Sequence, residues 1–248
     1  REGDAVAPAV LDEALAGSRA KLFYAQPRFA NPSGEAWSDA QAAATMEVLA
    51  AHGAYLVEDD WGYDFALEGR SVPVASRDRD GRVIYIRSLT KSVSPALRVA
   101  AVVARGPARA RIETDRTIND LYVSAVLQAA ALEVVSAPGR AAHLRSMQTQ
   151  LRARRDDLAR LVTRHLPEGA LTRVPAGGLN LWLRLPADAS ATEVAERCAL
   201  AGLLVSPGDE WFPTEPTGPF LRLNYAGPDP ARFEEAIRLL ARQLEPRI

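Results

Sequence analysis

The chain has 248 residues, of which 48% are hydrophobic and 25% charged, a balance typical of a globular protein with one large domain or two modest ones. The net charge of −1 argues against a nucleic-acid or membrane surface, and no apolar run reaches the ~18 residues of a membrane span. The single cysteine, Cys198, cannot form an internal disulfide, so we expect a reducing, cytoplasmic setting.

Helical and strand patterns alternate at the start of the chain. Residues 1–19 fit a short amphipathic helix, and residues 21–25 fit a short apolar strand. The strand runs into residues 26–34, whose Pro, Asn and Gly content predicts a loop. Ser38 is a suitable N-cap for a helix that continues to about Ala51.

Three further apolar runs predict strands at residues 54–57, 83–86 and 99–104. The first ends in Glu58-Asp59-Asp60 and the second at Ser88. Apolar strands that alternate with helices predict an α/β fold, with a mostly parallel sheet flanked by helices.

The middle of the chain, residues 108–165, has a helical pattern. Residues 123–136 are apolar with few charges, so we expect a buried helix there. Pro138-Gly139 interrupts the pattern, and residues 144–166 then fit a long, partly exposed amphipathic helix.

The last third of the chain mixes strands and helices over short distances, as a small α+β domain does. The predicted elements are a strand at 177–185, a helix at 191–201, strands at 203–205 and 220–225, and a helix that Asp229-Pro230 opens and that runs to about Leu244. We therefore divide the chain into a large domain at residues 1–140 and a small domain at 141–248.

Only two lysines, Lys21 and Lys91, stand beside 28 arginines. An amine can lose its proton and attack a carbonyl, whereas a guanidinium effectively cannot deprotonate. Because Lys91 comes shortly after a predicted strand, we interpret it as the residue that bonds the aldehyde of a cofactor. A surface lysine kept by chance is the alternative, and it is the interpretation we give to Lys21.

Polar side chains follow or end several predicted strands. In open α/β sheets, ligands bind beyond the carboxyl ends of the strands. We therefore expect the polar groups of the first domain to meet at one edge of its sheet, and a further one to approach from the small domain. These residues are Asn31, Asp59 or Asp60, Ser88 with Lys91, and Arg222.

The chemistry of these side chains matches pyridoxal phosphate. This cofactor needs an amine for its aldehyde and a carboxylate that keeps its pyridine nitrogen protonated. It also needs a donor for its phenolate oxygen, and a cation with hydroxyls for its phosphate. The residues that supply these groups, in the same order, are Lys91, Asp59 (with Asp60 as the alternative), Asn31, and Arg98 with Ser88.

Taken together, the motifs resemble those of the fold-type I pyridoxal-phosphate enzymes, the aspartate aminotransferase superfamily. The resemblance implies that Asn31 bonds the phenolate, that Asp59 bonds the pyridine nitrogen, and that Arg222 clamps the substrate carboxylate. It also implies that Lys91 forms the Schiff base, with Ser88, Thr90 and Arg98 near the phosphate. The matching segments are Asn31-Pro32-Ser33-Gly34, Val57-Glu58-Asp59-Asp60, Ser88-Leu89-Thr90-Lys91, Arg98 seven residues later, and Leu221-Arg222-Leu223-Asn224-Tyr225.

Within that superfamily, the residues around Asp59 and Lys91 resemble two branches: aminoadipate-type aminotransferases, and the aminotransferase-like domain of MocR-type regulators in the GntR superfamily. The first implies a homodimeric class I/II aminotransferase acting on an amino acid and a 2-oxo acid. The second implies a sensor of the cofactor or of an amino acid, with the DNA-binding domain outside this chain. Neither implies that this chain itself binds a membrane or nucleic acid.

Two features depart from the family pattern. The family's cofactor tyrosine follows the ring aspartate by two or three residues, where this chain has Trp61 and Gly62; Tyr63 comes fourth. The family domain also begins upstream of the first residue here, and that upstream part includes the turn that cradles the phosphate. We therefore expect this chain to be a truncated form, or to pair with a separate segment.

Overall fold

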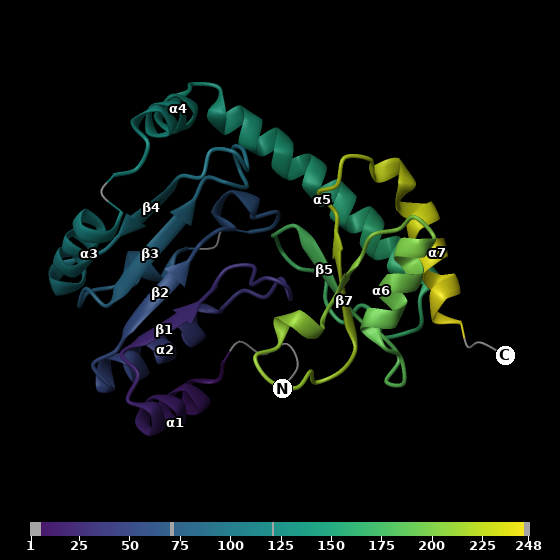
Figure 1. Cartoon of the computed structure of the whole chain (residues 1–248), viewed down its shortest axis with the longest axis horizontal. Helices are drawn as coiled ribbons and strands as arrows, with labels where there is room; N and C mark the ends of the chain where they lie inside the picture. Colours follow the sequence, from purple (N-terminus) through teal and green to yellow (C-terminus); the bar gives the residue numbers. More distant parts are fainter. Residues whose placement is uncertain (1–5, 70–71, 121, 246–248) are drawn as a thin grey trace. The chain divides into compact units, whose positions relative to one another are not determined.

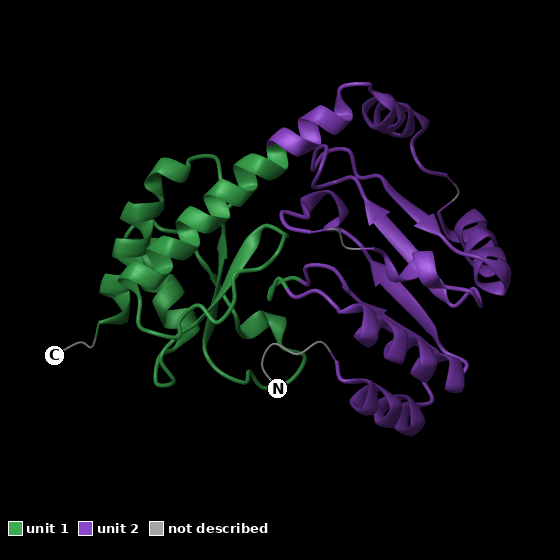
Figure 2. Ribbon diagram, turned by 180° about the vertical axis from the view of Figure 1, so that it is seen from behind, with its two compact units in different colours: residues 1–3, 31–34, 147–248 green, residues 4–30, 35–146 purple. Residues whose placement is uncertain are grey.

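The computed structural model describes residues 6–69, 72–120 and 122–245 (Figure 1). The described residues divide into two compact units (Figure 2). One comprises residues 31–34 and 147–245, and the other comprises residues 6–30 and the described part of 35–146. The division between them falls within one continuous helix, α5 (Arg140–His165). The division predicted from the sequence, between residues 140 and 141, stays a prediction.

Within the described residues, the unit that ends at Ser146 contains a four-stranded sheet with the order β1-β2-β3-β4. The first three strands are parallel and the fourth is antiparallel to its neighbour, which confirms the mostly parallel sheet. The strands are β1 (Leu22–Ala25), β2 (Tyr55–Asp59), β3 (Val83–Ser88) and β4 (Ala100–Val103).

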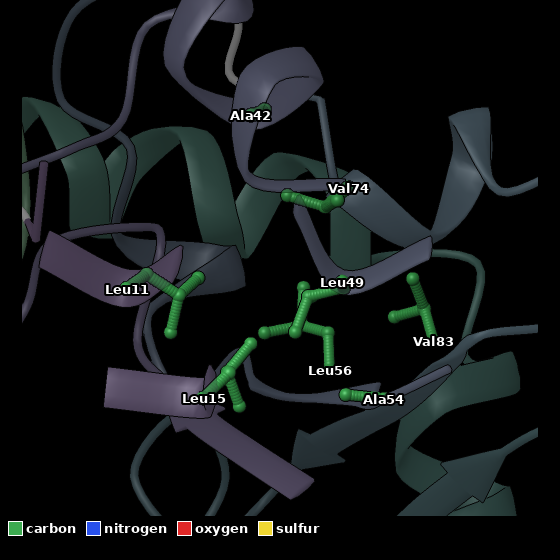
Figure 3. Packing of buried hydrophobic residues seen from close by; sticks show 8 residues of the cluster. All are labelled: Leu11, Leu15, Ala42, Leu49, Ala54, Leu56, Val74 and Val83. Carbon is green, nitrogen blue, oxygen red and sulfur yellow. The ribbon is translucent and has the colours of Figure 1, made fainter. Parts of the chain in front are cut away.

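Helices α1 (Pro8–Ser18) and α2 (Asp39–Ala51) form the core of this unit with the sheet. Leu49 and Leu56 have no exposed surface and lie in one apolar cluster with Leu11, Leu15 and Val83 (Figure 3). Burial of one such leucine contributes about 1.5–3 kcal/mol to the free energy of unfolding. As expected from the sequence, the Oγ of Ser38 accepts a hydrogen bond from the Gln41 amide, at 3.1 Å, and so caps α2.

Two helices separate β4 from α5: α3 (Gly106–Asn119) and α4 (Ala125–Ser136). The expectation that residues 123–136 form a buried helix is wrong in its second part. The helix forms, but Ala131 is its one buried residue, and the Val126 side chain is 77% exposed. Apolar composition favours burial only where other side chains pack against the helix, and few described residues do so here.

The other unit holds a three-stranded antiparallel sheet of described residues, in the order β5-β7-β6. The strands are β5 (Asn180–Arg184), β6 (Ser206–Pro207) and β7 (Phe220–Asn224). Helices α6 (Ala191–Leu200) and α7 (Phe233–Leu244) complete the unit together with the second part of α5. This arrangement is the small α+β unit that the sequence predicts.

Alternating leucines build the core of this sheet. Leu181 and Leu183 of β5 lie opposite Leu223 and Leu221 of β7, and all four are buried. The strand expected at residues 203–205 is wrong: the chain there is irregular, Leu204 is 88% exposed, and pairing begins only at Ser206. A short apolar run carries no information on where its partner strand begins.

Among the described residues, no helix combines the length and the apolar character needed to cross a membrane.

Candidate functional site

Asp59 is the last residue of β2, and its carboxylate is bound by side chains from β1 and the loop that follows. Its Oδ2 accepts a hydrogen bond from the Tyr24 hydroxyl at 2.6 Å and another from the Gln26 amide at 2.9 Å. The parallel register explains both contacts: Ala25 pairs with Glu58, so Gln26 comes next to Asp59. Among the described residues, the other oxygen, Oδ1, accepts no hydrogen bond.

Asp60, the alternative to Asp59, has a different environment. It is fully buried, accepts a hydrogen bond from the Tyr85 hydroxyl at 2.8 Å, and lies 3.5 Å from Nε of Arg28. Burial raises the pKa of the Asp60 carboxyl, and the charge of Arg28 opposes that rise. Oδ1 of Asp60 is buried beside Arg28 and accepts no hydrogen bond among the described residues. Asp59 is only partly buried, so its Oδ1 is the more accessible of the two to a further partner.

Lys91 follows β3, in a segment that turns back toward β4. The two ends of this segment, residues 89–99, are joined by a hydrogen bond from the Leu89 amide to the Val99 carbonyl, at 3.1 Å. Inside it, the Thr90 amide donates to Oγ of Ser88, at 3.2 Å. The Lys91 amine lies 4.8 Å from the ring centre of Trp61, a cation–π contact with a residue two positions after Asp59.

Arg98 ends the same segment, with a backbone φ of 46°. This left-handed conformation is uncommon for a residue that carries a Cβ, and such residues cluster at ligand sites. The guanidinium is exposed and forms no hydrogen bond or ion pair within the described residues. An exposed cation without a protein partner is suited to bind an anion.

In the other unit, the structure brings Asn31 and Arg222 together. Nη1 of Arg222 donates to Oδ1 of Asn31 at 3.0 Å, and Nη2 lies 3.4 Å from Oγ of Ser206, its cross-strand neighbour. The guanidinium also lies 4.6 Å from the ring centre of Trp211. Burial lowers the pKa of Arg222 below its ordinary value.

Gly34 ends the loop that carries Asn31, and it has a φ of +72°. A Cβ at this position would lie 2.6 Å from Cβ of Pro175, which is closer than carbon atoms approach. The loop therefore requires glycine here both for its conformation and for its contact with Pro175.

Tyr63 is held by two arginines. The guanidinium carbon of Arg87 lies 3.8 Å from the centre of its ring and that of Arg28 lies at 5.0 Å. The preceding residue, Gly62, leaves little space, because a Cβ there would lie 3.1 Å from the ring of Phe29. A large side chain at position 62 would clash with Phe29, which accounts for the glycine.

The structure thus places the predicted site residues in two sets. Asp59, Ser88, Thr90, Lys91 and Arg98 belong to one unit, at the carboxyl ends of β2 and β3 and in the segment that follows β3. Asn31 and Arg222 belong to the other unit and bond each other. The sequence motifs do not include the side chains that contact these residues: Tyr24, Gln26, Trp61, Ser206 and Trp211. Tyr24 and Gln26 are two residues apart, so they lie on the same face of β1 and its extension. This spacing is the one sequence feature that could have indicated their shared contact with Asp59.

The family model described as "Aminotransferase class I and II" matches residues 10–240. The chain belongs to this family. It is 24% identical over 230 residues to aromatic-amino-acid aminotransferase 1 of Thermococcus litoralis, a match that covers 92% of this chain and 55% of the relative. It is also 31% identical over 199 residues to the probable rhizopine catabolism regulatory protein MocR of Rhizobium meliloti, covering 79% and 40%.

A solved structure of similar fold is LysN, the α-aminoadipate aminotransferase of Thermus thermophilus, complexed with N-(5'-phosphopyridoxyl)-L-leucine. The TM-score is 0.87 at 26% identity, covering 95% of this chain and 61% of LysN. The chain therefore spans about half the length of the curated relatives it matches. The family resemblance, both of its branches and the fold class predicted from the sequence are confirmed.

Proposed function

We propose that this chain is the cofactor-binding part of a pyridoxal-phosphate-dependent aminotransferase. It would transfer an amino group between an amino acid and a 2-oxo acid, with Lys91 as the covalent anchor. The observation that carries this proposal is the placement of a carboxylate and an amine, Asp59 and Lys91, after adjacent parallel strands. Membership of the aminotransferase family supports it.

The residues present fit pyridoxal phosphate. Asp59 keeps one carboxylate oxygen unbonded within the described chain, and Arg98 has no protein partner there. Oγ of Ser92, beside Lys91, is buried and has no hydrogen-bond partner among the described residues. A carboxylate, an amine, a cation and a hydroxyl are the groups that this cofactor needs.

When bound, pyridoxal phosphate supplies an aldehyde and an electron-withdrawing ring that stabilises negative charge at the substrate Cα. In this proposal, Lys91 would hold the cofactor through its Nζ and would also move a proton to and from the substrate Cα. Oδ1 of Asp59 would accept a hydrogen bond from the N–H of the pyridine ring. Ser88, Thr90 and Arg98 bind the phosphate.

Asn31 and Arg222 provide the remaining functions. Arg222 would bind the substrate carboxylate through two parallel hydrogen bonds, which the planar guanidinium allows and a lysine would not. Its bond to Oδ1 of Asn31 supports this role by fixing the orientation of the guanidinium. The Asn31 amide nitrogen would donate to the phenolate oxygen of the cofactor.

A second candidate function is that of a sensor domain in a MocR-type transcription regulator. The 31% identity to MocR and the Trp61-Gly62 pair, where the enzymes have a tyrosine, favour it. The same residues would then bind pyridoxal phosphate or an amino acid, and DNA binding would belong to a domain outside this chain. For either function we propose that the protein is a homodimer, on the basis of the family resemblance. We also propose that it is located in the cytoplasm, on the basis of its single cysteine.

The test is an absorbance titration of the purified protein with pyridoxal phosphate, wild type beside Lys91→Ala. Lys21→Ala serves as the matched control, because Lys21 is the other lysine and its Nζ donates to the His52 carbonyl, at 2.8 Å, and to no other described residue. We expect a visible band in the wild type and the control that is absent from Lys91→Ala. A band that survives in Lys91→Ala would contradict the assignment of Lys91.

Turnover separates the two functions. Steady conversion of an amino acid with 2-oxoglutarate, lost by at least a thousandfold in Lys91→Ala, is expected for the enzyme, since covalent and proton-transfer roles contribute effects on the order of 10²–10⁴ each. A change in the visible band on adding an amino acid, without turnover, is expected for the sensor.

A further inference from the structure

Tyr24, Gln26 and Asp59 form one hydrogen-bonded group at the end of the β1–β2 pair. The proposed reaction uses Asp59 but assigns no role to Tyr24 or Gln26. The Tyr24 hydroxyl and the Gln26 amide both donate to Oδ2 of Asp59, at 2.6 and 2.9 Å. The Gln26 amide nitrogen also lies 3.2 Å from the Tyr24 oxygen, to which it donates. Each member therefore contacts the other two.

The group is a consequence of the β1–β2 register. Tyr24 pairs with Val57 and Ala25 with Glu58, so the line of β1 brings Gln26 level with Asp59. Residues two apart along a strand direction lie on the same face, which puts Tyr24 and Gln26 on the side where the Asp59 side chain lies.

Both donors keep their protons at physiological pH. Partial burial of Tyr24, which is still 58% exposed, and then the hydrogen bond to Asp59 raise the pKa of its hydroxyl to about 12, so it remains a donor. A carboxamide does not ionise, so Gln26 also remains a donor. The contacts to Asp59 therefore persist under the conditions in which an aminotransferase acts.

A carboxylate rotates readily about its terminal torsion, which is broad and roughly two-fold. Two donors on the same oxygen select one orientation, in which Oδ2 is occupied and Oδ1 remains for a third donor. With one donor removed, the carboxylate can exchange its two oxygens and turn away.

We propose that Tyr24 and Gln26 are positioning residues for Asp59, which fix its carboxylate so that Oδ1 is held ready for the pyridine nitrogen of the cofactor. This inference rests on the proposed function, because it assigns a purpose to the orientation of the residue that binds the ring. It adds two residues, neither of which belongs to the motifs around Asn31, Asp59 or Lys91.

The experiment compares the dissociation constants of pyridoxal phosphate and of its 1-deaza analogue, in which a C–H replaces the ring nitrogen. The ratio of the two constants measures the ring-nitrogen contact alone, since the aldehyde and the phosphate are common to both compounds. The variants are Tyr24→Phe, which removes only the hydroxyl, and Gln26→Met, which keeps the length of the side chain. Tyr122→Phe is the matched control, because Tyr122 is 81% exposed and its hydroxyl makes no hydrogen bond within the described residues.

We expect the wild type and Tyr122→Phe to prefer pyridoxal phosphate equally. Tyr24→Phe and Gln26→Met should each reduce that preference by roughly three- to tenfold, which is the net contribution of about one ordinary hydrogen bond. Asp59→Ala should abolish the preference for pyridoxal phosphate and so define the smallest ratio of the two dissociation constants that can be expected.

A merely structural role for Tyr24 and Gln26 would weaken the binding of both compounds by the same factor and leave the ratio unchanged, which would overturn the inference. A wild type that binds neither compound would overturn the proposed function and this inference together. A wild type that binds both, but without any preference for pyridoxal phosphate, would reject the Asp59 contact and hence the positioning role, while leaving the proposed anchoring by Lys91 in place.

Discussion

Helices α2 and α4 belong to the same unit, and their environments differ sharply. Both are rich in alanine, and α4 carries no charged residue except Glu133. Helix α2 nevertheless buries Ala42, Thr45 and Leu49, whereas α4 buries only Ala131. The difference shows that apolar composition sets what a helix could bury, and that the surrounding elements decide what it does bury.

The largest expected effect is the loss of unfolding free energy when a core leucine of α2 is shortened. Leu49→Ala should lower the free energy of unfolding by about 2–5 kcal/mol, because it opens a cavity in the cluster shared with Leu56 and Val83. The equivalent change on α4, Leu132→Ala, removes a side chain that is 63% exposed and should cost less than about 0.5 kcal/mol. Urea unfolding of both variants checks the contrast; equal losses would mean that α4 is buried in solution.

A smaller effect concerns the buried acid of β2. Glu58 is 1% exposed, and its carboxyl oxygens accept hydrogen bonds from the amides of Val74 and Ala75, at 2.9 and 2.8 Å. Burial raises the pKa of Glu58, and these two amides oppose the rise.

Because the folded protein binds this proton more tightly than the unfolded chain does, stability should fall as the pH rises from the unfolded pKa, about 4.3, through the raised folded value. Tenfold tighter proton binding by the folded protein corresponds to about 1.4 kcal/mol of stability. Urea unfolding from pH 4 to 8 should therefore show a steeper decline for the wild type than for Glu58→Gln. Glu133→Gln, on the exposed face of α4, is the control; parallel curves for the wild type and Glu58→Gln would refute this.

The smallest effect concerns the N-caps of the two helices. Ser38 caps α2 at 3.1 Å, and Ser124 caps α4 at the longer distance of 3.5 Å. Ser38→Ala should cost about 1 kcal/mol, and Ser124→Ala clearly less, since the hydrogen bond weakens with distance. Thermal unfolding of the two variants measures the difference, and a larger loss for Ser124→Ala would reverse the ranking.

Local signals predicted most of the fold. The Ser38 cap placed the start of α2, and the Pro138-Gly139 pair placed the gap between α4 and α5. The residues at which β2 and β3 end were correct, and with them the positions of Asp59 and Ser88. The wrong predictions, the burial of α4 and the strand at 203–205, both concern a partner element that a local pattern does not contain.

The candidate site divides in the same way. The sequence supplied Lys91, because an amine cannot be replaced by a guanidinium, and the family pattern supplied Asp59, with Asp60 as the alternative. The structure distinguishes their environments: Asp60 contacts Tyr85 and Arg28 inside the unit, and Asp59 contacts Tyr24 and Gln26. The bond between Arg222 and Asn31, 191 residues apart, was likewise not predictable.

The sequence by itself determined the class of fold, the order of the elements and the types of side chain at the strand ends. Hydrophobic period, caps and turn residues act over a few neighbouring positions, so a sequence contains them completely. Only the tertiary structure decided which donors hold each carboxylate, how deeply each carboxylate is buried, and which apolar helix is covered. Each of these depends on strand register and packing between distant segments, which arise only when the chain folds.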